Sequence, residues 1–203
     1  MRTVVHLSDL HFGRTDPDLL APLARQIAGL QPHLVVVSGD LTQRARSSQF
    51  EEARRFLDTL PRPQVVVPGN HDIPLYNVLG RFVAPLRRFR SIISHDLHPE
   101  YIDDEIAVVG VNTARSLTFK DGRINARQMA HVQARLCGLD DHLTKIIVTH
   151  HPFDLPEGFH EHEIVGRAPD AMRAFLHCGA DLMLSGHLHA SGVASSAANP
   201  EIR

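Results

Sequence analysis

Residues 64–72 read QVVVPGNHD, a β-branched apolar run followed at once by a turn and a polar cluster. The same design recurs, because residues 34–40 read LVVVSGD and residues 3–11 read TVVHLSDLH. Short apolar runs bounded by turn residues are typical of buried strands, and polar side chains that directly follow them collect at the carboxyl edge of an α/β sheet. This repeated pattern therefore predicts both the fold class and the position of a functional site.

Six apolar runs are expected to be strands, and most are continuous rather than alternating, as in strands covered on both faces. The expected strands are Thr3–Leu7, Leu34–Val37, Gln64–Val67, Ile106–Val111, Lys145–Val148 and Asp181–Leu184. Helical patterns lie between them, at 21–30, at 48–60 with a capping box from Ser48 to Glu51, at 75–90, at 125–139 with Asn125 as N-cap, and at 168–179. Alternating strands and helices predict a single α/β domain over residues 1–203.

The composition is that of an ordinary globular protein, with 43% hydrophobic and 22% charged residues and a net charge of −2. No global positive field indicates nucleic acid or an anionic membrane as a partner. Cys137 and Cys178 are far apart and lack a C-x-x-C spacing, so we expect two buried thiols and neither a disulfide framework nor a thiolate zinc site. No targeting segment or membrane-spanning stretch is evident, and a cytoplasmic location is the expectation.

The polar clusters after the strands are rich in Asp, Asn and His, which suit manganese, iron, zinc or cobalt better than magnesium or calcium. A single cluster is more often a turn or a surface histidine, but ligand types after five of the six expected strands favour a metal site. If Asp40 bridges, seven residues supply four protein bonds to each of two ions. The clusters are Asp9-Leu10-His11, Gly39-Asp40, Gly69-Asn70-His71-Asp72, His150-His151 and Gly186-His187-Leu188-His189.

This ordered set of clusters resembles the calcineurin-like metallophosphoesterase superfamily, and within it the bacterial class III cyclic-nucleotide phosphodiesterases, from Val4 to His189. The resemblance implies a four-layer α/β/β/α sandwich of two mixed sheets. It also implies a hydrolase in which a hydroxide shared by two divalent ions attacks a phosphoryl group. By motif position, one ion would be held by Asp9, His11, Asp40 and His189, and the other by Asp40, Asn70, His150 and His187.

Two further positions follow from the same motifs. The family's ligand histidine lies two residues before a proline, so Pro152 selects His150 as the ligand and leaves His151 as a pocket or substrate-binding residue. His71 is expected to protonate the leaving oxygen as a general acid. Asp72 would hold the His71 imidazole in its charged form or cap the next segment.

Several other polar residues have weaker assignments. Asn112, after the fourth expected strand, would contact substrate or form a turn. His6 is expected to be a packed core histidine. The remaining candidates are Arg44, Arg46 and Arg115 as phosphate-neutralising or merely solvated residues, His160 and His162 on a pocket rim, and the unassigned His95 and His98.

The chain ends fourteen residues after His189, whereas the resemblance implies further strands. A C-terminally truncated sequence is therefore expected, which leaves the completeness of the second sheet open. An incomplete sheet would expose an edge that favours association, so a homodimer is one expectation.

The leading functional hypothesis is hydrolysis of small phosphodiesters, with 3′,5′-cyclic nucleotides as the best single guess. The alternatives are a phosphomonoesterase, a nucleotide-pyrophosphate hydrolase, including a lipid-precursor enzyme, or a non-catalytic scaffold. The scaffold is disfavoured because every motif position is filled. A nuclease is disfavoured because the sequence has no basic surface.

Overall fold

The strands form two sheets. The computed structural model covers residues 1–203 and describes all but residues 118–120, 156–163, 190–191 and 193–203. One sheet is parallel, with the order β1 (Val4–Leu7), β2 (Leu34–Ser38), β3 (Gln64–Val67). The other has the order β4 (Glu100–Ile102), β5 (Ile106–Gly110), β6 (Thr144–Val148), β7 (Leu182–Leu184), and only β4 runs antiparallel to its neighbour.

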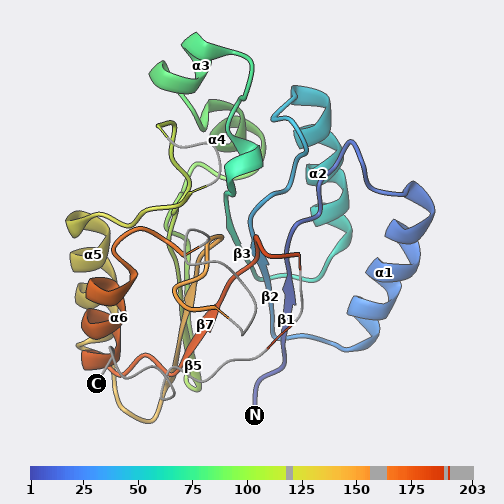
Figure 1. Cartoon of the computed structure of the whole chain (residues 1–203). Helices are drawn as coiled ribbons and strands as arrows, with labels where there is room; N and C mark the ends of the chain where they lie inside the picture. Colours follow the sequence, from blue (N-terminus) through green and yellow to red (C-terminus); the bar gives the residue numbers. More distant parts are fainter. Residues whose placement is uncertain (118–120, 156–163, 190–191, 193–203) are drawn as a thin grey trace.

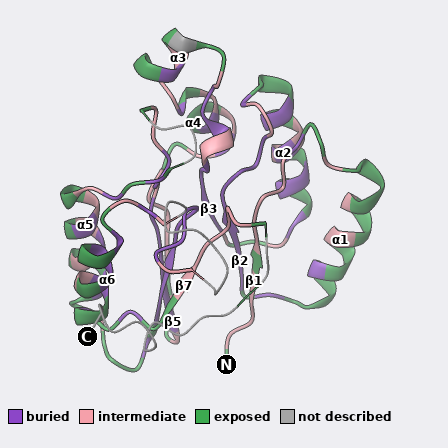
Figure 2. Cartoon of the chain, in the orientation of Figure 1, coloured by how far each residue is buried: buried purple, intermediate pink, exposed green. Residues whose placement is uncertain are grey.

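The two sheets pack face to face between two layers of helices (Figure 1). One outer face is covered by α1 (Pro17–Gly29), α2 (Ser47–Thr59) and α4 (Arg87–Ile92), and the other by α5 (Ala126–Leu136) and α6 (Ala168–His177). Figure 2 shows that the buried residues concentrate along the strands and on the helix faces turned toward them. This confirms the expected α/β/β/α sandwich, although among the described residues only the second sheet is mixed and the first is wholly parallel.

The continuous apolar runs reflect burial on both faces. In β2, Val35 and Val37 pack against the helices, whereas Leu34 and Val36 pack against the other sheet. Successive side chains of a strand point to opposite faces, so a central strand of a four-layer sandwich must be apolar at every position. All five residues of β2, and all five of β5, are accordingly buried.

All six expected strands are present, but β4 was not predicted. Glu100-Tyr101-Ile102 is too short and too polar for an apolar run, and it becomes a strand by pairing with β5 in a hairpin. Among the described residues β7 is the outer strand of its sheet. Association of copies along that edge stays a prediction, because residues 190–191 and 193–203 lie outside the described part of the chain.

Three helix predictions need correction. The helix expected over 75–90 is two short helices, α3 (Val78–Val83) and α4, because Pro85 interrupts the pattern. The capping box expected from Ser48 to Glu51 is wrong, since α2 begins one residue earlier and the Gln49 side chain accepts hydrogen bonds from the Arg44 and Arg46 amides. Helix α1 begins before residue 21, because Pro17 occupies its first turn rather than breaking it.

The other two helix predictions are confirmed. Asn125 accepts a hydrogen bond from the Gln128 amide at 3.0 Å, and the Gln128 side chain accepts one from the Asn125 amide at 2.9 Å, which completes a reciprocal cap on α5. Helix α6 begins at Ala168 with a proline in its first turn, and Gly179 follows it with a φ of +76°.

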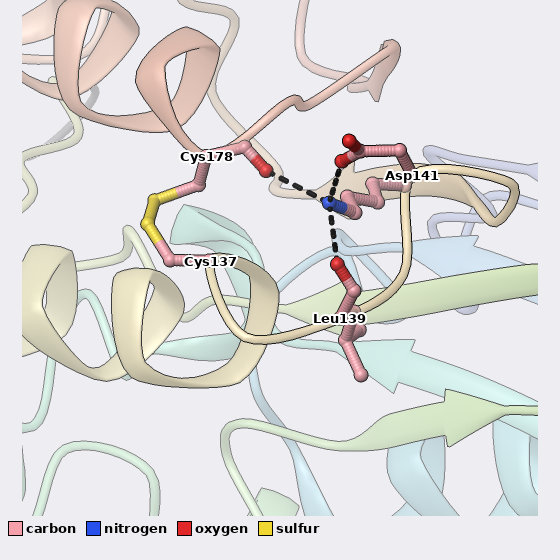
Figure 3. The surroundings of a disulfide bond; sticks show 5 residues. Cys137, Leu139, Asp141 and Cys178 are labelled. Atoms are coloured by element: carbon pink, nitrogen blue, oxygen red, sulfur yellow. Dashed lines mark hydrogen bonds and ion pairs between the residues drawn. A yellow bond between two sulfur atoms is a disulfide. The ribbon is translucent and has the colours of Figure 1, made fainter.

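The expectation of two separate thiols is wrong, because Cys137 and Cys178 form a disulfide (Figure 3). They are the C-cap residues of α5 and α6, and their Cα atoms lie 4.2 Å apart. A separation of 41 residues gives no hint of this proximity, which arises only when the two helices pack side by side on the second sheet. Disulfides are uncommon in reducing compartments, so the cysteines no longer support a cytoplasmic location.

A buried lysine lies beside the disulfide. The Lys145 ammonium donates to the carbonyl oxygens of Leu139 and Cys178, at 3.1 and 3.2 Å, and lies 3.6 Å from an Asp141 carboxylate oxygen (Figure 3). These contacts tie β6 to the C-terminal ends of both helices, at the place where the disulfide joins them.

Removal of the disulfide is expected to destabilise the protein. Cys137→Ala should lower the free energy of unfolding by about 2–4 kcal/mol, because the crosslink restricts a long loop of the unfolded chain. Urea unfolding with and without dithiothreitol measures this effect, and the variant should no longer respond to the reductant. Equal stability of the wild type under both conditions would contradict the prediction.

Asp103 closes the hairpin between β4 and β5 and attaches it to the N-terminus. Its carboxylate accepts hydrogen bonds from the Glu105 and Ile106 amides at 2.8 and 2.9 Å, and lies 2.8 Å from the Arg2 guanidinium. Burial opposes ionisation, but these donors outweigh it and lower the pKa of Asp103 to about 2. The ionised side chain therefore stabilises the folded state.

Asp103→Asn is expected to lower the free energy of unfolding at pH 7 by about 1 kcal/mol. Because the folded pKa lies below the unfolded value of about 4, this stabilisation is present above pH 4 and is lost as the pH falls toward 2. Thermal unfolding from pH 2 to 7 should show the wild type and the variant converging in acid. Glu51→Gln, which alters an exposed side chain of α2, is the control. A gap that does not change with pH would refute the charge-based explanation.

Candidate functional site

The polar clusters meet at the carboxyl ends of β1, β2, β3, β6 and β7, because the parallel strands of the two packed sheets point the same way. Four groups of Asp and His residues have potential ligand atoms within 4.8 Å of one another. Each predicted ligand other than Asn70 belongs to at least one group, and Asn70 lies against His150. The groups are Asp9 with His11 and His189; His11 with Asp40 and His71; Asp9 with Asp40 and His150; and His150 with His151 and His187.

The first group joins the two ends of the chain. The Nε2 atoms of His11 and His189 face each other at 3.1 Å, and the Asp9 carboxylate lies 3.5 Å from the His189 nitrogen and 3.9 Å from the His11 nitrogen. Asp9 also accepts a hydrogen bond from the His187 amide at 3.0 Å, which fixes the last loop against the first. Two imidazole nitrogens and a carboxylate thus converge on one point.

Asp40 lies between this group and the next. One of its carboxylate oxygens is 3.8 Å from the His11 Nε2, and the other is 3.4 Å from the His150 Nε2. Burial disfavours the carboxylate, but the charge and hydrogen bond of His150 outweigh burial and hold the pKa of Asp40 well below its usual range. The position of Asp40 therefore suits a bridging ligand.

His150 is oriented as a metal ligand would be. Its Nδ1 donates to the Ser38 carbonyl at 2.8 Å, since a carbonyl can only accept, and its Nε2 lies 2.9 Å from the Asn70 side-chain oxygen. Metal-binding histidines are commonly positioned by such a backbone hydrogen bond through the other ring nitrogen. Burial opposes the imidazolium, but the Asp40 charge raises the pKa of His150 to about 9.

The backbone at the predicted ligands is unusual. Five of them have positive φ angles, from 46° to 75°, a conformation that non-glycine residues adopt uncommonly. Such strain clusters at functional sites, where the surrounding structure holds it in place. No sequence signal identifies it beyond the tolerance of Asp and His for this region. The five residues are Asp9, His11, Asp40, His187 and His189.

Two glycines permit the close approach of the strand-end loops. A Cβ atom on Gly39, whose φ is +87°, would lie 2.7 Å from the His150 Nδ1. A Cβ atom on Gly69 would lie 2.1 Å from an Asp40 carboxylate oxygen. Any side chain at either position would push the bridging carboxylate or its neighbouring imidazole out of place.

The donor set fits divalent transition metals. It mixes imidazole nitrogens with carboxylate and amide oxygens, and no described lysine or arginine forms an ion pair with Asp9 or Asp40. The His11 Nδ1 is buried and has no hydrogen-bond partner, although its Nε2 faces the converging donors. Imidazoles and carboxylates that point at one another in this way are arranged for cations.

His71 lies beside Asp40 and is held through its other ring nitrogen. The His71 amide donates to the Asp40 carboxylate at 2.8 Å, and its Nδ1 donates to the Gln43 carbonyl at 3.0 Å. This leaves Nε2 to act on a substrate. The ring is 4.9 Å from the His11 ring, centroid to centroid, so geometry alone also admits His71 as a ligand.

The contacts of Asp72 differ from both expectations. Its buried carboxylate accepts hydrogen bonds from the Leu41, Thr42 and Gly69 amides, at 2.9–3.2 Å, and its hydrogen bonds do not include the His71 ring. It does not cap the next helix either, since Asn77 caps α3. Burial and the nearby charge of Asp40 raise the pKa of Asp72 to about 6. Asp72 therefore joins the loops after β2 and β3.

His151 and Asn112 lie next to the predicted ligands. His151 is buried, its Nδ1 is 2.8 Å from the Thr113 hydroxyl, and its ring is 4.7 Å from that of His187. It shares only one of the four groups, whereas His150 shares two, which favours His150 as the ligand. The Asn112 side chain accepts from the Ala114 amide at 2.9 Å, so it forms the turn that was its alternative assignment.

The remaining candidates divide by location. The expectation that His6 is a packed core histidine is wrong, because His6 is exposed on β1, the outer strand of its sheet among the described residues. Its Nε2 still lies 2.7 Å from the Ser38 hydroxyl on β2. Arg44 stacks on Tyr76 at 5.6 Å. Arg46 is the N-cap residue of α2, and His98 is packed against His131. His95 and Arg115 line a cavity described below. His160 and His162 lie outside the described residues.

Comparison with known protein families matches residues 2–191 to the calcineurin-like phosphoesterases. The chain belongs to this family. That confirms the assignment made from the strand-end motifs, and members of the family normally use divalent metals. No helix among the described residues is long and apolar enough to cross a membrane.

Three curated proteins are similar in sequence. The chain is 28% identical to the glycerophosphodiester phosphodiesterase GpdQ of Enterobacter lignolyticus over 75% of its own length and 58% of that protein. It is 25% identical to the UDP-2,3-diacylglucosamine pyrophosphatase LpxG of Chlamydia trachomatis, over 92% of its own length and 63% of that protein. It is also 25% identical to a probable cyclic nucleotide phosphodiesterase of Synechococcus, over 92% of its own length and 73% of that protein. The chain thus spans less than two thirds of the first two relatives.

A solved structure supports the fold. The purple acid phosphatase PPD1 from yellow lupin superimposes with a TM-score of 0.69 at 17% identity, over 92% of this chain and 37% of that one. At this identity the likeness concerns the fold alone.

Proposed function

We propose that residues 1–203 form one domain that binds two divalent transition-metal ions and hydrolyses phosphodiesters. The observation that carries the proposal is the position of Asp40, which lies between two sets of converging donors. Asp9, His11 and His189 would complete one site with Asp40, and Asn70, His150 and His187 would complete the other. When bound, two such ions polarise the phosphoryl group and supply a nucleophile at neutral pH.

The chain's own residues prepare this chemistry. The Ser38 carbonyl fixes the His150 ring, and the His187 and His71 amides fix the Asp9 and Asp40 carboxylates, so the donors need little rearrangement. The buried Asp72 carboxylate joins the loop after β2 to the loop after β3. His71 is assigned as the general acid, because its Nδ1 is held by the Gln43 carbonyl while its Nε2 remains to protonate the leaving oxygen.

The proposed substrate class is a small phosphodiester, with 3′,5′-cyclic nucleotides as one candidate. The relatives named for glycerophosphodiesters and cyclic nucleotides support a diester, whereas the relative named as a pyrophosphatase supports the alternative of a pyrophosphate bond. Both reactions transfer a phosphoryl group to water and need the same metal site. A non-catalytic scaffold is disfavoured by the complete donor set.

A substrate panel tests the proposal. Metal-stripped protein reconstituted with Mn²⁺ should hydrolyse bis-p-nitrophenyl phosphate faster than p-nitrophenyl phosphate, and excess chelator should abolish both activities. Cyclic AMP and a nucleoside diphosphate ester, assayed in parallel, separate the cyclic-nucleotide and pyrophosphate alternatives. Preference for the monoester would overturn the diesterase assignment. If no member of the panel were hydrolysed with manganese, iron, zinc or cobalt, the proposed phosphoesterase activity would be overturned.

A further inference from the structure

A cavity of about 680 Å³ lies beside the metal site, between the segment that holds α3 and α4 and the loop that follows β5. Figure 1 shows α3 and α4 beyond the ends of the strands, on the side of the molecule where the clusters gather. A volume of this size is typical of pockets that enclose an organic ligand of drug size, and is larger than a phosphate group requires.

Part of the cavity lining is apolar. Val83, Leu86 and Leu97 contribute to it from the segment around α3 and α4, and Leu117 contributes from the loop after β5. Leu86 is buried against the core, whereas Val83 and Leu117 are 74% and 77% exposed. Exposed aliphatic side chains that line a cavity leave apolar surface in water, and a ligand that covers them gains binding free energy.

The cavity lining also carries positive charge, from the three arginines Arg87, Arg90 and Arg115. Each lies outside the ion pairs and side-chain hydrogen bonds found in the described part of the chain, and the described residues that line the cavity include no Asp or Glu. Arginines in this setting favour an anionic group, since the guanidinium is always charged and presents several donors.

The loop after β5 connects the lining of the cavity to the neighbours of the predicted ligands. Asn112 lines the cavity, and the next residue, Thr113, is 2.8 Å from the His151 Nδ1. His151 in turn contacts the rings of His150 and His187, at 4.8 and 4.7 Å. A group attached to a phosphate at the metal site could therefore enter the cavity.

We propose that this cavity binds the retained alcohol substituent of the substrate, and that this substituent is an extended apolar group that carries a negative charge. The proposal rests on the proposed function, because it assigns a second part of the same substrate. The expected substrates are therefore amphiphilic phosphodiesters rather than small, uniformly polar esters.

Three synthetic diesters test the proposal, all with p-nitrophenol as the leaving group. The second substituent is methyl, octyl or 7-carboxyheptyl, each below the concentration at which it aggregates. The octyl ester should have a KM at least about tenfold below that of the methyl ester, and the terminal carboxylate should lower it by a further severalfold, with similar kcat. Equal KM values for the three esters would overturn the proposal that the cavity binds the substituent, whereas the proposed diesterase activity would still stand.

Paired variants locate the effect. Leu117→Asp should remove the preference for octyl, and Arg90→Gln should remove only the advantage of the carboxylate. The matched controls are Leu30→Asp, at a side chain that is 55% exposed beyond α1, and Arg25→Gln on the exposed face of α1. A preference that survives both cavity variants would overturn the assignment to this cavity. Failure of all three esters to react would overturn the proposed function together with this inference.

Discussion

Replacement of Asp40 by Asn is expected to lower kcat/KM for bis-p-nitrophenyl phosphate at least about a thousandfold, which corresponds to about 4 kcal/mol of transition-state stabilisation. The substitution preserves the size of the side chain and an acceptor for the His71 amide, 2.8 Å away. It removes the charge that lies between His11 and His150. The loss would therefore report the bridging role rather than a disturbed loop.

The control for this variant is Asp58→Asn, which alters a surface carboxylate that is 47% exposed. Activity of the control should match that of the wild type, and thermal unfolding should show that the Asp40 variant remains folded. If the folded Asp40→Asn protein hydrolysed the diester at the parental rate, Asp40 would not be a bridging ligand.

His71→Ala is expected to act on the leaving group. With phenyl esters, whose leaving group needs a proton, kcat should fall by about 10²–10⁴-fold, whereas with p-nitrophenyl esters it should fall much less. The metal content should not change, because the His71 amide that holds Asp40 is retained. A series of aryl diesters should give a steeper dependence of log kcat on leaving-group pKa in the variant than in the wild type.

His142→Ala, at a side chain that is 63% exposed and remote from the clusters, is the control for this series. An equal loss of kcat on every ester, with the metal retained, would refute the role of His71 as general acid. It would instead assign His71 to stabilisation of charge in the transition state. A loss of metal would instead make His71 a ligand, as its place beside His11 and Asp40 allows.

The order of the strands' apolar runs and polar clusters was enough to predict most of the fold. Central strands such as β2 are apolar at every position because both of their faces are covered, and this local property is visible in sequence. The predicted ligands meet because the strands that carry them are parallel and end at the same edge. Proximity in space then follows from the topology without a knowledge of distances.

Features that depend on tertiary contacts could not be predicted in this way. Strand β4 exists through its pairing with β5, and the Cys137–Cys178 disulfide exists because two helices end side by side. Asp72 follows directly on His71 in sequence, yet its carboxylate turns toward the loop after β2. The left-handed backbone at Asp9 and the cavity beside the site likewise depend on how separate loops pack.

A dinuclear site requires one chain to bind two metal ions with Asp40 between them. Its most direct measurement is the metal content of metal-stripped protein reconstituted with Mn²⁺ and separated from free ions, determined by elemental analysis for the wild type and Asp40→Asn. We expect two ions per chain in the wild type and at most one in the variant. A wild type that retains one ion or none, or a variant that retains two, would contradict it.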